Sequence, residues 1–67
     1  MTPEEIREAR RALGLTQTEF GEMLHVTLKT VQDWEYGRRK MLKITQKFLQ
    51  KKLEEKGLQM PSASGSS

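Results

Sequence analysis

A run of three basic residues, Arg38, Arg39 and Lys40, is the group in this chain best suited to bind an anion. Guanidinium and ammonium groups form charge-assisted hydrogen bonds with phosphate and carboxylate. The run also marks a change of charge along the chain. Residues 1–36 carry four Lys or Arg against seven Asp or Glu, a net charge of −3, whereas residues 37–67 carry eight against two, a net charge of +6. This uneven distribution favours an anionic partner more than the overall charge of +3 does.

No group of residues has the composition of a catalytic or metal-binding centre. The chain has no cysteine and one histidine, His25, so neither thiolates nor imidazoles can assemble a metal site. It also has no glycine-rich loop of the kinds that hold nucleotide phosphates. Glu4, Glu5 and Glu8 fall at the start of a predicted helix, where negative charge stabilises the helix dipole. We therefore predict a protein that is not an enzyme and that holds no cofactor or metal.

The apolar residues are too scattered for a membrane segment. They never run on for more than two or three positions, whereas a membrane-spanning helix needs roughly 20. The N-terminus lacks the basic and then apolar pattern of a secretory signal. We expect a cytoplasmic protein with no membrane partner.

Two capping boxes predict where the first two helices begin. Thr2 with Glu5, and Thr16 with Glu19, have the spacing at which each side chain bonds the other residue's backbone amide. Gly14 lies between the two boxes and predicts the end of the first helix, because glycine adopts a left-handed conformation without steric penalty.

Residues 17–36 have the layout of two helices joined by a very tight turn. Thr27 can cap a new helix and Gly37 can end it. Gly21 is the small residue that two steeply crossing helices need where their backbones approach. The apolar residues that close the angle from both sides are Phe20, Leu24, Val26, Val31 and Trp34. The side chains left off this core face are Leu28, Lys29, Gln32 and Asp33. The helix that begins after Thr27 therefore projects from the domain, and a helix has the right width for the major groove of DNA.

A fourth helical pattern follows the basic run and Gly57 predicts its end. Its expected buried side consists of Leu42, Thr45, Leu49 and Leu53, with Ile44 and Phe48 next to them. We predict one folded domain over residues 1–57. Residues 58–67 are mostly small and polar, and we predict a disordered tail there.

The stretch from residue 6 to residue 40 resembles the phage repressor and Cro group of helix-turn-helix proteins, also called the Xre family. Residues 15–21, Leu-Thr-Gln-Thr-Glu-Phe-Gly, are similar to the LTQxEFA sequence of that family's second helix. Residues 31–39, Val-Gln-Asp-Trp-Glu-Tyr-Gly-Arg-Arg, are similar to its VxxWExGxR sequence, which is common in short regulators and in antitoxins of the HigA type. The resemblance implies an all-α fold, a compact four- to five-helix bundle with a helix-turn-helix, like the lambda-repressor DNA-binding domain.

The chain departs from the family at two positions. His25 stands where the family usually has glycine, so the turn needs either a positive φ at histidine or a different path. Met41 stands where a proline often precedes the fourth helix, which predicts a looser or an earlier helix start.

The resemblance also implies which residues bind DNA. Those implied to face the major groove and read bases are Thr27, Leu28, Lys29, Gln32 and Asp33. Those implied to bind backbone phosphate are Thr16, Gln17, Thr30, Tyr36, Arg38, Arg39 and Lys40. By the donors and acceptors of the bases, Lys29 suits guanine, Gln32 adenine and Asp33 cytosine. An ion pair between Arg10 and Glu35 is implied to be structural.

These expectations combine into one leading hypothesis and two alternatives. The leading one is a transcriptional regulator, a repressor that binds a palindromic operator on double-stranded DNA as a homodimer, associated with the nucleoid. One alternative is an antitoxin with a cognate toxin as partner, which uses DNA binding to regulate its own operon. The other is a protein-interaction module on the same fold, which the net charge of −3 in residues 1–36 favours.

Overall fold

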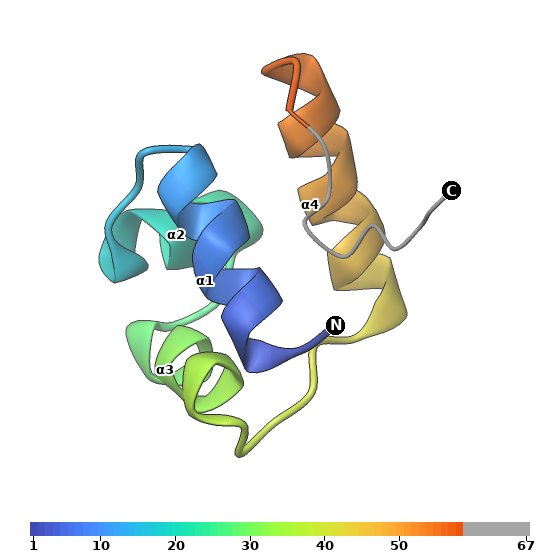
Figure 1. Cartoon of the computed structure of the whole chain (residues 1–67). Helices are drawn as coiled ribbons and strands as arrows, with labels where there is room; N and C mark the ends of the chain where they lie inside the picture. Colours follow the sequence, from blue (N-terminus) through green and yellow to red (C-terminus); the bar gives the residue numbers. More distant parts are fainter. Residues whose placement is uncertain (59–67) are drawn as a thin grey trace.

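Four helices make up the part of the chain that the computed structural model describes, residues 1–58. They are α1 (Pro3–Ala12), α2 (Gln17–Leu24), α3 (Leu28–Tyr36) and α4 (Lys43–Glu55) (Figure 1). No strand occurs among these residues. The all-α prediction is therefore confirmed, and four helices of the predicted four to five lie within the described residues.

The starts of α1 and α2 follow from local hydrogen bonds. The Thr2 hydroxyl accepts from the Glu5 N–H at 3.2 Å, and the Glu5 carboxylate accepts from the Thr2 N–H at 2.8 Å. Thr16 and Glu19 form the same pair of bonds at 3.1 and 2.9 Å. These bonds satisfy amides that lack partners within the helix, so both predicted capping boxes are present.

The hydrophobic core joins all four helices. Its buried members are Ile6, Ala9, Phe20, Leu24, Val31, Trp34, Met41, Leu49 and Leu53. Both α1 and α2 pack against α3, and α4 packs against α2. Figure 1 shows α4 standing beside the group formed by α1, α2 and α3. This packing holds α3 at the edge of the domain, away from α4.

The approach to α4 differs from the prediction at Leu42. We expected Leu42 on the buried side, but it is 69% exposed and Met41 is buried in its place. The reason is that helical geometry begins only at Lys43, while Leu42 has the extended dihedral angles φ −65° and ψ 151°. The Gln46 side-chain amide donates to the Met41 carbonyl at 2.9 Å and holds this extended entry in place. The absence of a proline at residue 41 allowed an earlier helix start, but α4 begins only at Lys43.

The described part of the chain ends just after α4. Gly57 adopts a left-handed φ of 75°, at the point where the sequence predicts the end of the helix. Leu58, one residue past the predicted domain boundary, packs partly against the core. The remainder of the predicted tail, residues 59–67, lies outside the described residues. Among residues 1–58, no helix has the length and apolar character required to cross a membrane.

Candidate nucleic-acid interface

The turn between α2 and α3 takes only three residues, and its geometry explains the glycine inside α2. His25 adopts the left-handed conformation, with φ 61° and ψ 41°. This lets the Val26 N–H donate to the Gly21 carbonyl at 2.8 Å. A Cβ atom added at Gly21 would lie 2.9 Å from the Val26 carbonyl oxygen and 3.3 Å from Val31 Cγ2. The tight turn therefore has a positive φ at His25, the first of the two options left open by the sequence, and it requires glycine at residue 21.

Gly21→Val is expected to destabilise the chain by about 1–3 kcal/mol, because the added side chain must displace the backbone of the turn. Chemical denaturation followed by circular dichroism measures this destabilisation. Thr18→Val is the matched control, since Thr18 is exposed on the same helix. Equal midpoints for the two variants would show that the turn tolerates a larger residue.

The first turn of α3 presents its side chains to solvent. The Thr27 hydroxyl caps the helix by accepting from the Thr30 N–H at 3.2 Å. Thr27, Leu28 and Lys29 are exposed, and Gln32 is half-buried one turn further along. Side chains at positions 28, 29 and 32 lie on neighbouring faces of a helix. The structure therefore brings four of the five predicted base-reading residues to one accessible surface.

Asp33, the fifth predicted base-reading residue, lies in a different environment. Its side chain is only 12% exposed, and its carboxylate is 3.8 Å from the Lys29 ammonium group. Its main-chain carbonyl accepts from the Arg38 and Arg39 N–H groups at 2.8 and 3.3 Å. The main chain of Asp33 thus holds the basic loop against the end of α3. Little of the Asp33 side chain faces solvent.

The basic loop follows α3 directly. Gly37 ends the helix with a left-handed φ of 80°. Arg38, Arg39 and Lys40 are all exposed after it. The Arg38 guanidinium lies over the Tyr36 ring, 5.6 Å from its centroid, which is within the range of a cation–π interaction. The loop therefore places three cations and an exposed aromatic ring at the end of α3 opposite to Thr27.

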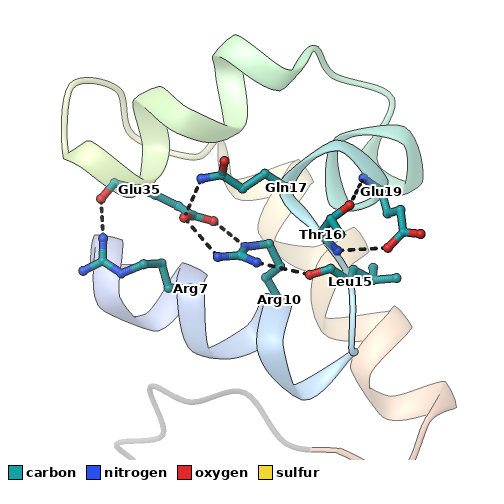
Figure 2. Close-up of polar contacts among 7 residues, drawn as sticks. All are labelled: Arg7, Arg10, Leu15, Thr16, Gln17, Glu19 and Glu35. Atoms are coloured by element: carbon teal, nitrogen blue, oxygen red, sulfur yellow. Dashed lines mark hydrogen bonds and ion pairs between the residues drawn. The ribbon is translucent and has the colours of Figure 1, made fainter.

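A buried carboxylate connects α1, α2 and α3 (Figure 2). The Glu35 side chain is 3% exposed. It accepts from Arg10 Nε at 2.8 Å and from Arg10 Nη2 at 3.4 Å. Arg10 also donates to the Leu15 carbonyl at 3.2 Å, and Arg7 donates to the Glu35 main-chain carbonyl at 2.7 Å. An ionised group at this depth needs such partners, because burial without them is costly.

Gln17 belongs to the same network. Its Nε2 atom donates to Glu35 Oε1 at 3.0 Å (Figure 2). An amide nitrogen carries two hydrogens, so one donor remains for the predicted phosphate contact. Gln17 and Thr16 both lie at the start of α2, where free backbone N–H groups and the helix dipole favour an anion. The bond to Glu35 therefore fixes the orientation of Gln17 before any ligand binds.

Sequence reasoning missed two contributors to this region. Arg7 gives no distinctive signal, because one more arginine in the first helix is indistinguishable from surface charge. The main-chain carbonyl of Asp33 cannot be assigned from residue types at all.

Thr30, a predicted phosphate contact, lies half-buried, and its hydroxyl is 3.0 Å from the Thr27 hydroxyl.

Comparison with known proteins agrees with this geometry. The sequence model of the family described as Helix-turn-helix matches residues 6–40, slightly more than half of the chain. A Type II methyltransferase, M.MspI, from Moraxella sp is 41% identical over 56 residues, which is 84% of this chain. The match covers only 13% of that methyltransferase. No solved structure matches the chain significantly. The matched residues contain α2, the tight turn, α3 and the basic loop, and the chain belongs to the helix-turn-helix family of the phage repressor, or Xre, type.

Proposed function

We propose that this chain is a sequence-specific transcriptional regulator that binds double-stranded DNA as a homodimer and represses from a palindromic operator. The observation that carries the proposal is the exposed first turn of α3, with Leu28 and Lys29 on it and the loop Arg38–Lys40 at its other end. A helix held in this way enters the major groove, while the flanking cations contact phosphate. A single module of this size covers half a site, which supports two copies per operator.

Selection of bound duplexes from a random pool tests the proposal directly. We expect a palindrome whose half-sites repeat about one helical turn, 34–36 Å, apart. A titration with mixed-sequence duplex at low salt is the companion measurement, since nonspecific binding is electrostatic. Absence of binding in both measurements would contradict DNA binding and favour a protein-interaction module.

Gln32→Ala is expected to weaken the preference for adenine at one position of each half-site by about 1–3 kcal/mol. The amide of Gln32 can bond adenine N6 and N7 together, which alanine cannot do. Competition between operator duplexes that differ at one base pair measures this preference. Gln50→Ala is the matched control, because Gln50 lies on α4 and its side-chain amide donates to Glu54 on the same helix. A base preference that stays the same in Gln32→Ala would remove Gln32 from base recognition.

We further infer that the chain carries no catalytic step of its own. Three of its acidic side chains support this, because Glu5 and Glu19 are used in helix caps and Glu35 in the buried network.

The similarity to a Type II methyltransferase favours a second candidate function. In this alternative the domain provides DNA contacts for a methyltransferase, or regulates the gene of one. The supporting observation is that the matched segment spans most of this chain and a small part of that enzyme. Footprinting on genomic DNA separates the candidates: a bound site upstream of a methyltransferase gene favours this alternative, and a site beside a toxin-like gene favours an antitoxin.

A further inference from the structure

The large exposed apolar side chains of the described residues form two groups. Those of the first, Leu28 and Tyr36, lie at the two ends of α3, in the proposed DNA interface. Those of the second, Leu42, Ile44 and Phe48, fall within seven residues at the start of α4. Ile44 is 75% exposed and Leu42 is 69% exposed. DNA contacts explain the first group but not the second, and clustered apolar exposure on a small protein indicates a binding surface.

Two members of the second group, Ile44 and Phe48, line a shallow groove. The groove has a volume of about 250 Å³ and is lined by Leu24, His25, Ile44, Thr45 and Phe48. The end of α2 forms one wall and the first half of α4 the other. The centroids of the His25 and Phe48 rings lie 6.3 Å apart across the groove. The groove therefore joins the apolar start of α4 to the turn that leads into α3.

We propose that this groove is the surface by which a second copy of the chain docks, related to the first by a two-fold axis. The choice of occupant rests in part on the proposed function, because a palindromic operator needs two copies. Charged residues next in sequence to those that line the groove support the same occupant. Glu22 is exposed in the last turn of α2, just before Leu24 and His25, whereas Lys43 and Lys47 are exposed on α4 beside Ile44 and Phe48. A two-fold axis repeats every contact, so an arrangement in which the α2 wall of each copy faces the α4 wall of the other pairs Glu22 with these lysines twice around an apolar centre.

The position of the groove also suits the binding of two docked copies to one DNA operator. His25 lies on the groove wall, and only Val26 and Thr27 separate it from α3. Docking here therefore places the two α3 helices on either side of the symmetry axis while leaving the first turn of each exposed. The Arg38–Lys40 loop lines no part of the groove and stays available for phosphate.

Ile44→Glu tests the proposal, because residue 44 is exposed and a charge there need not disturb the fold. Sedimentation over a concentration series is expected to show reversible dimers of the unmodified chain and monomers of Ile44→Glu. Ala12→Glu is the control, since it adds the same charge at an exposed site at the end of α1, and it should remain dimeric. Circular dichroism confirms that both variants are folded. A monomeric unmodified chain, or a dimeric Ile44→Glu, would overturn the proposal.

DNA binding by the same proteins separates this proposal from the proposed function. On a duplex with one half-site, Ile44→Glu should bind as well as the unmodified chain. On a duplex with two half-sites it should bind about 100-fold more weakly, because the two copies no longer bind as a linked pair. Failure of every protein to bind any duplex would contradict the proposed function and leave the dimer to be judged by sedimentation alone. Equal weakening on both duplexes would place residue 44 in the DNA interface and overturn the docking proposal.

Discussion

Arg10→Ala is expected to leave much of the chain unfolded at room temperature. The substitution removes the guanidinium 2.8 Å from a carboxylate that is only 3% exposed. Removing one partner of a buried ion pair costs about 3–5 kcal/mol, because the remaining charge stays buried and loses its counter-charge. A single core of fewer than about 70–80 residues rarely supplies more than about 3–5 kcal/mol in total. Urea denaturation followed by circular dichroism measures the change in the free energy of unfolding.

Two further variants show whether the buried charge is the cause. Arg11→Ala changes the neighbouring arginine, which is exposed, and should shift the midpoint very little. The double variant Arg10→Met with Glu35→Leu replaces the pair with apolar side chains and should recover most of the stability that Arg10→Ala removes. A midpoint for Arg10→Ala equal to that of Arg11→Ala would refute a stabilising role for the pair.

Arg38→Ala combined with Arg39→Ala is expected to weaken operator binding about 100-fold at low salt, since each charge-assisted hydrogen bond contributes about 1.5 kcal/mol or more. The slope of log K against log salt should fall by about 1.8, or about 0.9 for each phosphate that the variant no longer neutralises. Fluorescence anisotropy at several salt concentrations gives both quantities. The fold should persist, because alanine retains the N–H groups that bond to the Asp33 carbonyl.

A control with the same reduction in charge separates local binding from overall charge. Arg11→Ala combined with Lys56→Ala also removes two exposed cations, but these lie outside the proposed interface. Its effect on the slope should be small. If both double variants changed the slope equally, the loop would contribute only to the net charge, and its assignment to phosphate binding would be wrong.

The buried network connects these two results. Glu35 is one residue before Tyr36 at the end of α3, and it also bonds to Gln17 at the start of α2. These two segments are proposed to contact phosphate on opposite sides of the DNA major groove, and the Glu35 carboxylate joins them. Their spacing is set before DNA binds, so less ordering is required on binding.

Local signals were sufficient for the helices of this chain. The capping residues Thr2, Thr16 and Thr27 each bond within their own first turn, and Gly37 ends α3 by its own dihedral angle. Such interactions involve residues three or four positions apart, so residue types and spacing reveal them. The resemblance to the phage repressor family then identified the helix-turn-helix, and the family comparison confirmed it.

The tertiary structure decided the features that depend on residues distant in sequence. Met41 rather than Leu42 enters the core because an extended segment breaks the helical spacing before α4. Asp33 is largely buried at the end of α3. Gln17 and Arg7 converge on Glu35 from 18 and 28 residues away. Amino-acid sequence alone determined the helices, their caps and the tight turn, because these depend on neighbouring residues. Burial and long-range hydrogen bonds depend on how the helices meet, and only the folded chain establishes that.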